Sequence, residues 1–255
     1  MKYKIKAGVT SCKGNYRSIN EDNFLLGNKF LNNKGLDTSL KAKFKIPEVF
    51  AICDGMGGSN HGREAALTAV DILFKSVYRL NILKQPLLLP QLDLLIKDMN
   101  DKVYSLTARG TTTGCTLAMG YFDEQRIYLA NVGDSRIYRF YENKLEQLSV
   151  DHNQAQDIIS FGILADKNNK NNVLTQYIGM SPYEIIIEPN YRTLEYDNMF
   201  LLLCSDGLML RNEDMKEIIS FHHKSPQKIT RVLVEEAFKQ GSRDNITAMI
   251  IKIYS

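Results

Sequence analysis

Three apolar runs in this sequence each end at an aspartate that stands beside a glycine. Short apolar runs rich in β-branched and aromatic residues predict buried strands. An Asp at the end of each exceeds what a turn requires, and carboxylates gathered in one place cannot all stay ionised without cations. Clusters of oxygen donors select hard divalent ions, Mg²⁺ or Mn²⁺, over zinc. The runs and their acidic ends are 49–53 with Asp54-Gly55, 127–132 with Gly133-Asp134, and 199–205 with Asp206-Gly207.

Arg17 stands four residues before Glu21 and five before Asp22, so a guanidinium precedes two adjacent carboxylates. Alone, this spacing is typical of a surface ion pair. A metal-bound phosphate site needs the same parts, because carboxylates hold the ion and the Arg fork takes two phosphate oxygens. Both interpretations stay open on these residues alone.

The glycine-rich stretch that begins at Asp54 has three interpretations. Asp-Gly is a common hairpin-turn signal. Gly55-x-Gly57 after an apolar strand is also typical of a dinucleotide loop, but Asn60 stands where the third Gly or Ala belongs and no βαβ pattern surrounds it. The third interpretation makes Asp54 a bridging metal ligand and the Gly55 carbonyl another, because glycine lets the backbone approach an ion closely.

The elements that must position these residues follow from periodicity. Strands in meanders and helices in blocks indicate an α+β fold with antiparallel sheets rather than a βαβ array. The segment 27–47 is predicted to be a hairpin or surface loop. The predicted strands are 3–9, 23–26, 49–53, 112–122, 126–132, 136–140, 183–187, 199–205 and 245–253. The predicted helices are 66–77, 90–110, a short one over 151–161, and two that begin at Asn212 and Ser225-Pro226.

Composition narrows the class of protein. A chain of 255 residues is long enough for a single domain over 1–255, and its net charge of +3 supports neither nucleic-acid nor membrane-surface binding. No run reaches membrane-span length and no signal-peptide pattern follows Met1. The four cysteines form no CxxC pair, and three lie inside apolar runs as small hydrophobes. We therefore expect a location in the reducing cytoplasm, and a monomer is the default expectation for the oligomeric state.

Six motifs follow one another along the chain: Gly14-x-x-Arg17-x-x-Asn20-Glu21-Asp22, Asp54-Gly55-Met56-Gly57-Gly58, Gly110-Thr111-Thr112, Gly133-Asp134-Ser135-Arg136, Ser205-Asp206-Gly207 and Arg243-Asp244-Asn245. Taken in order, they resemble one family, the metal-dependent protein phosphatases of type 2C (PPM). The first two motifs are similar to those of its bacterial serine/threonine branch. The resemblance extends from Gly8 to the last strand, with motif order and spacing kept.

The resemblance implies a sandwich of two antiparallel sheets flanked by helix pairs. Asp54 would bridge two Mn²⁺ or Mg²⁺ ions, and Arg17 would clamp the phosphate. Asp134 would hold a third ion with Asp206, and Asp22 would support the metal ligands. The Gly55 carbonyl, Glu21, Asp206 and Asp244 would complete the coordination, directly or through water.

The expected activity is hydrolysis of phosphoserine and phosphothreonine in phosphoproteins, opposed by a serine/threonine kinase. Two ions about 4 Å apart would make a shared water acidic enough to attack phosphorus in line. One rival is a pseudophosphatase that acts as a binding module, although all of the expected carboxylates are present. The other rival is a nucleotide-binding oxidoreductase built on the Gly55 loop.

The sequence departs from the family pattern in ways that affect the proton donor and the substrate. Met56 stands where eukaryotic members carry a His taken as the leaving-group acid; His61 is a weak substitute, and water is the better candidate. The family's mobile flap falls at 160–172 and is short, so substrate preference does not carry over. His152, after Asp151, lacks a zinc partner set and is interpreted as structural.

Overall fold

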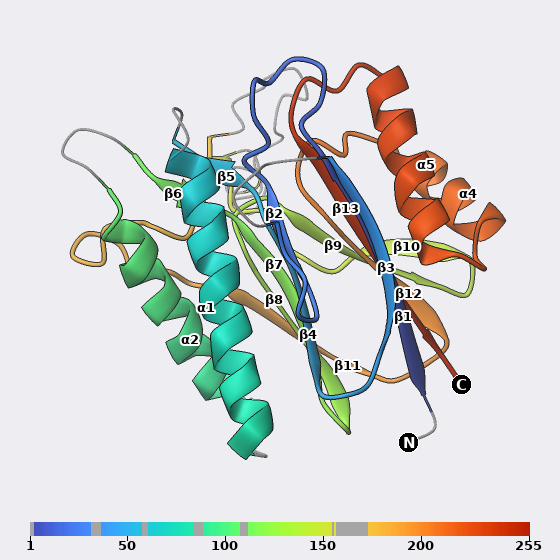
Figure 1. Ribbon diagram of the computed structural model, residues 1–255, viewed down its shortest axis with the longest axis horizontal. Coiled ribbons are helices and arrows are strands. Elements are labelled where there is room, and N and C mark those ends of the chain that lie inside the picture. Colours follow the sequence, from blue (N-terminus) through green and yellow to red (C-terminus); the bar gives the residue numbers. More distant parts are fainter. Residues whose placement is uncertain are drawn as a thin grey trace.

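The molecule is built of four layers, two helix pairs outside and two antiparallel sheets inside (Figure 1). The computed structural model describes residues 3–31, 37–57, 61–83, 89–107, 112–154, 156 and 173–255, the side chains of 77–83 excepted. The predicted α+β sandwich is confirmed.

Each sheet combines strands from both halves of the chain. Every pairing between the described strands is antiparallel, so the βαβ unit that a dinucleotide loop needs is absent from the described part of the chain. The larger sheet has the order β10 (Lys144–Gln147), β9 (Arg136–Tyr141), β12 (Met199–Cys204), β13 (Ile246–Tyr254), β1 (Lys4–Cys12) and β3 (Thr38–Phe44). The second has the order β11 (Asn190–Glu195), β8 (Arg126–Val132), β7 (Leu117–Phe122), β4 (Glu48–Cys53) and β2 (Asn23–Leu26). A two-stranded ladder joins β5 (Gly55–Met56) to β6 (Gly114–Cys115).

The helices cover the outer faces of the two sheets. α1 (His61–Leu83) and α2 (Leu89–Tyr104) lie on the second sheet, while α4 (Asn212–Phe221) and α5 (Pro226–Lys239) lie on the larger one (Figure 1). The start of α5 is the predicted one, because the Ser225 side chain accepts a hydrogen bond from Lys228 N and Pro226 fits the first helical position. No helix of the described residues is long and apolar enough to cross a membrane.

The continuous apolar runs follow from burial on both faces of each strand. In β4, Val49, Ala51 and Cys53 belong to the cluster under α1 and α2, and Phe50 and Ile52 to the cluster between the sheets. Side chains alternate between the two faces of a strand, so a strand covered on both sides shows no polar alternation. β13 divides its side chains in the same way between the inter-sheet cluster and the cluster under α4 and α5.

Several predicted elements need correction. The predicted strand 183–187 is wrong, because 182–184 form a turn and 185–189 are unpaired. Tyr183 and Ile186 are exposed, so these apolar residues do not mark the buried face of a strand. The strand in this region is β11. The segment predicted as a hairpin or loop contributes β3, which pairs with β1. α2 ends at Tyr104 instead of running to 110, and the strand predicted over 112–122 is interrupted at Thr116. The helix predicted over 151–161 and the flap at 160–172 lie mostly outside the described residues.

Candidate metal and phosphate site

The ends of four strands bring four aspartates to one end of the sandwich. Asp54 directly follows β4, and Asp134 and Asp206 follow β8 and β12 within two residues. Asp244 precedes β13, whose start lies beside the end of β12 because the two strands are antiparallel, with Ala248 opposite Cys204. A pocket of about 530 Å³ opens here. Its charged and ligand-capable lining consists of Arg17, Glu21, Asp54, Gly55, Asp134, Asp206 and Asp244.

The loop that carries Arg17 is held by one amide side chain. Asn245 Nδ2 donates to the carbonyl oxygens of Lys13 at 2.8 Å and Ile19 at 2.9 Å, which fixes both ends of the loop. Asn245 Oδ1 accepts from Glu21 N at 2.8 Å. One residue at the start of β13 therefore positions both the candidate phosphate-binding arginine and a candidate ligand.

Asp22 lies beneath the pocket rather than on its lining. Its Oδ2 accepts from Ser205 Oγ at 2.8 Å and from Thr247 Oγ1 at 2.7 Å. Its Oδ1 is buried without a hydrogen-bond partner. Burial raises the pKa of Asp22 to about 7, against the lowering effect of the two hydroxyl donors. A buried carboxylate oxygen without a donor is what a nearby cation, directly or through water, would satisfy.

Asp54 is fixed through its backbone. Its N–H donates to Thr116 Oγ1 at 3.0 Å, and Thr116 Oγ1 lies 2.6 Å from Ser135 Oγ. The next residue, Gly55, touches the start of α1 so closely that a Cβ there would collide with the Gly62 carbonyl oxygen. Glycine at 55 is therefore required by packing.

The carboxylates of the pocket raise one another's pKa. Burial, followed by the charges of Asp22, Asp206, Asp244 and Asp134, holds the pKa of Asp54 well above its usual range. Burial, followed by the charge of Asp206, raises the pKa of Asp134 to about 7. Burial, followed by the charge of Asp244, also raises the pKa of Asp206. Raised pKa values mean that these carboxyls tend to hold protons, which divalent cations would replace, so the donor set fits hard ions.

The side chains do not by themselves enclose a metal ion. Within the described residues, no three His, Cys, Asp or Glu side chains are arranged as ligands of a single ion. Mg²⁺ characteristically keeps several water ligands and takes only one or two carboxylates from the protein. The arrangement therefore fits ions held largely through water, with the partnerless Glu21 Oε1 and Asp22 Oδ1 nearby.

The pair Asp151-His152 has structural contacts. Asp151 accepts from Arg136 Nε at 2.9 Å and Nη2 at 2.7 Å. His152 Nδ1 accepts from Gly133 N at 3.2 Å, and its Nε2 is hydrogen-bonded to Asn190 Nδ2. These contacts brace the turn that carries Asp134, in agreement with the structural interpretation.

The sequence did not single out three residues that support the site. Thr116 lies between β6 and β7, Thr247 is the second residue of β13, and Tyr177 lines the pocket from a segment that carries none of the motifs. Their roles depend on cross-strand contacts, which leave no local signal. His61 begins α1 and is not among the pocket-lining residues.

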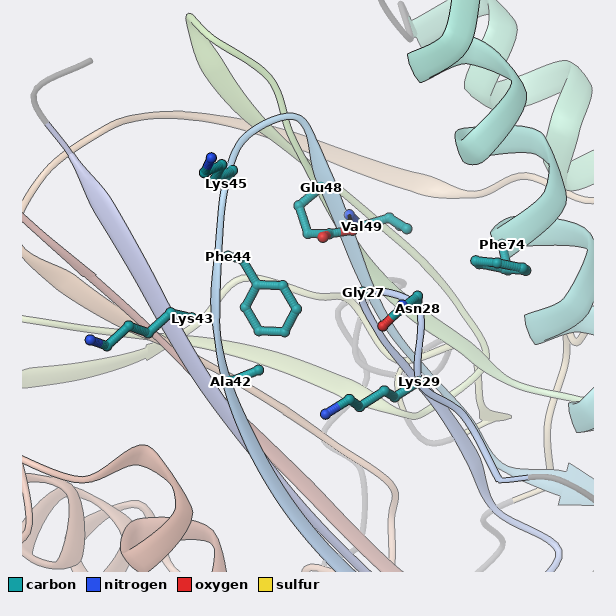
Figure 2. A pocket seen from close by; sticks show the side chains of 10 residues that line it. All are labelled: Gly27, Asn28, Lys29, Ala42, Lys43, Phe44, Lys45, Glu48, Val49 and Phe74. Carbon is teal, nitrogen blue, oxygen red and sulfur yellow. Dashed lines mark hydrogen bonds between the residues drawn. The ribbon is translucent and has the colours of Figure 1, made fainter.

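A second hollow, of about 390 Å³, lies where the open edges of the two sheets meet (Figure 2). Lys29, Lys43 and Lys45 stand at its rim, and among the described residues Glu48 is the one carboxylate in its lining. A single carboxylate beside three lysines does not make a divalent-cation site, so the chemistry of the motifs belongs to the first pocket.

Comparisons with known proteins identify the family of the chain. Residues 6–157 match the family described as Protein phosphatase 2C. The serine/threonine phosphatase stp of Listeria monocytogenes serotype 4b is 28% identical over 251 residues, covering 94% of this chain and 92% of that protein. A putative protein phosphatase of Mycoplasma genitalium is 27% identical over 221 residues, covering 80% of this chain and 84% of that protein.

Solved structures show the same fold. The catalytic domain of the phosphatase PstP, solved with two manganese ions, aligns with a TM-score of 0.78 at 22% identity and covers 100% of both chains. Stp1 of Staphylococcus aureus aligns with a TM-score of 0.78 at 24% identity, covering 98% of this chain and 95% of that one.

The fold and its acidic pocket define a metal-dependent phosphatase of the α-β-β-α sandwich class. The chain belongs to the protein phosphatase 2C family.

Proposed function

We propose that the protein hydrolyses phosphoserine and phosphothreonine in phosphoproteins, using two Mn²⁺ or Mg²⁺ ions in the pocket at the end of the sandwich. The observation that carries the proposal is the convergence of Arg17 with five acidic residues and the Gly55 backbone, drawn from distant parts of the chain, on one pocket. A turn residue or a surface ion pair would not require that convergence.

The proposed ligands follow from position. Asp54 lies between the other carboxylates and would hold both ions, with Glu21, Asp206, Asp244 and the Gly55 carbonyl as further donors. Asp134, beside Asp206, would serve a third and weaker ion. Asp22 would act from below through its free oxygen. When bound, such ions lower the pKa of water and neutralise charge on the phosphoryl oxygens.

Arg17 would bind and orient the phosphate. Its Nη2 donates to Asp244 Oδ2 at 2.6 Å, and both residues line the pocket. A guanidinium has five N–H donors, so the remaining ones stay available for phosphate oxygens. Asp244 would thus fix the phosphate position relative to the ions.

The proton for the leaving alkoxide would come from water. The described lining of the pocket contains no histidine, and Met56 occupies the position next to Gly55. The side chains of this site would therefore bind and orient the phosphate and the ions and supply charge. None of the four cysteines is needed as a nucleophile, since all four are buried.

The cellular setting is also a proposal. We infer phosphoprotein substrates prepared by a serine/threonine kinase, a cytoplasmic location, a monomeric state, and no requirement for nucleic acid or membrane. The small net charge supports the last point, because it provides no strong general attraction to polyanions.

Hydrolysis of p-nitrophenyl phosphate and of a phosphothreonine peptide tests the function. We expect both reactions to require added Mn²⁺ or Mg²⁺ and to stop with EDTA. The pseudophosphatase alternative predicts that the protein binds Mn²⁺ in calorimetry but hydrolyses neither substrate. No observed feature favours that alternative, because every expected donor lies in or directly beneath the pocket.

A further inference from the structure

A second arginine, Arg243, lies in one of the segments that line the pocket. The Arg243 guanidinium lies over the Tyr16 ring, with Cζ 5.5 Å from the ring centroid. Both side chains are exposed, Tyr16 by 66%. Tyr16 directly precedes Arg17, and Arg243 directly precedes Asp244, so each belongs to a segment that lines the pocket. The stack therefore bridges the two segments beside the Arg17–Asp244 ion pair.

The two arginines differ in how their charge is used. Arg17 is paired with Asp244 at 2.6 Å. Within the part of the chain that the structure describes, no carboxylate lies within ion-pair distance of Arg243. The Arg243 guanidinium lies over the Tyr16 ring, and a guanidinium fork matches the two oxygens of a carboxylate.

The stack is held in place before any substrate arrives. Asn245 ties Lys13 O and Ile19 O together at the base of the loop that carries Tyr16. Gly14 packs against the backbone of Asp244 so closely that a Cβ there would collide with the Asp244 carbonyl oxygen. A loop anchored this way presents its side chains with little ordering cost on binding.

We propose that the Tyr16–Arg243 stack is a subsite for an acidic side chain close to the phosphorylated residue of the substrate. The inference rests on the proposed function, because the stack borders the pocket that would hold the phosphate. An exposed arginine elsewhere on the surface would simply be solvated. Here the cation lies over a ring, and both residues of the stack are next in the chain to residues that line the pocket.

Three phosphothreonine peptides of equal length test the proposal. One carries Glu within three residues of the phosphothreonine, one carries Gln at the same positions, and one carries the same Glu residues displaced to its far end. At low ionic strength we expect kcat/KM for the first to exceed that for the second by roughly two- to fivefold, the range of an exposed ion pair. The third peptide should resemble the second, and added NaCl should reduce the difference. A fourth phosphothreonine peptide, with phosphoserine in place of Glu, compares a phosphate with a carboxylate as the group bound by the stack.

Two variants and one control locate the effect. Arg243→Gln should bring the Glu/Gln ratio close to one, and Tyr16→Leu should lower it, because the guanidinium loses its aromatic face. Arg231→Gln, an exposed arginine on α5, should leave the ratio unchanged. Peptide binding measured by fluorescence anisotropy should show the same ratios. The proposal is overturned if wild type shows no preference, if the displaced-Glu peptide is preferred equally, or if Arg243→Gln keeps the ratio. Absence of all hydrolysis with Mn²⁺ would instead refute the proposed function, while the anisotropy ratios would still decide the subsite.

Discussion

Arg17 Nη2 donates to Asp244 Oδ2 at 2.6 Å, so the residue expected to hold the phosphate is itself held by a residue expected to hold a metal ion. The two lie 227 positions apart in the chain. Asp244 also raises the pKa of Arg17 through this hydrogen bond. The contact links substrate binding to the acidic pocket, and it makes separate predictions for each member.

Arg17→Ala should mainly raise KM for phosphopeptides, with a smaller effect on kcat, because the clamp acts on substrate and transition state alike. Hydrogen bonds to charged groups are worth about 1.5–3 kcal/mol, so kcat/KM should fall roughly 10- to 100-fold. Steady-state kinetics with saturating Mn²⁺ measure the effect, and Arg231→Ala is the matched control. A loss confined to kcat would contradict the clamp.

Asp54→Ala should lower kcat by about two orders of magnitude or more while the protein stays folded, and Asp54→Asn should behave alike with less change of shape. Both remove the central carboxylate of the proposed metal site. Circular dichroism should be unchanged, and Mn²⁺ binding in calorimetry should weaken. Asp98→Asn, an exposed residue on α2, serves as the control. Retained turnover in the Asp54 variants would refute the assignment.

The metal-free protein should lose stability as pH rises from about 4 to above 7. Burial raises the pKa of Asp22 and Asp134 from 3.8 in the unfolded chain to about 7 in the folded one. The folded state therefore binds more protons across that window, and the free energy of unfolding falls by at most about 1.4 kcal/mol per pH unit for each group.

Thermal unfolding in EDTA between pH 4.5 and 8 checks this slope. Asp134→Asn should flatten it, and saturating Mn²⁺ should raise Tm most at the alkaline end, where protons no longer compete for the carboxylates. A metal-free Tm that rises steadily toward pH 8 would contradict the prediction.

Asn245→Ala should reduce both stability and activity. It leaves the part-buried groups Lys13 O, Ile19 O and Glu21 N without their partner. An unsatisfied group costs about 1–3 kcal/mol when it is buried, which is the upper limit for each of these. Asn245→Asp keeps the acceptor for Glu21 N and loses the two donations, so it should retain the ligand position better than the loop. Tm and KM for a phosphopeptide measure the two effects. If Asn245→Ala and Asn245→Asp change Tm and KM equally, the separation between the loop contacts and the Glu21 contact is contradicted, and the Asn245 side chain supports both as one unit.

Much of the fold was predictable because it depends on local pattern. The run 49–53 is apolar throughout, which indicates a strand buried on both sides, and β4 has that environment. Ser225-Pro226 marked the start of α5, because a side-chain cap and a fixed φ act within one turn. The strand 183–187 was predicted wrongly, since exposed apolar residues carry the same signal as buried ones.

The sequence alone determined which residues are available to the site: carboxylates at strand ends, an arginine four residues before Glu21, and glycines where backbones pack closely. It also determined, through motif order, the family and hence the type of site. Only the tertiary structure decided that Asp22 lies beneath the pocket, that Asp244 engages Arg17, and that Arg243 stacks on Tyr16. These relationships depend on antiparallel pairing between strands more than two hundred residues apart, and periodicity along a chain records which face a residue occupies, not which distant residue it meets there.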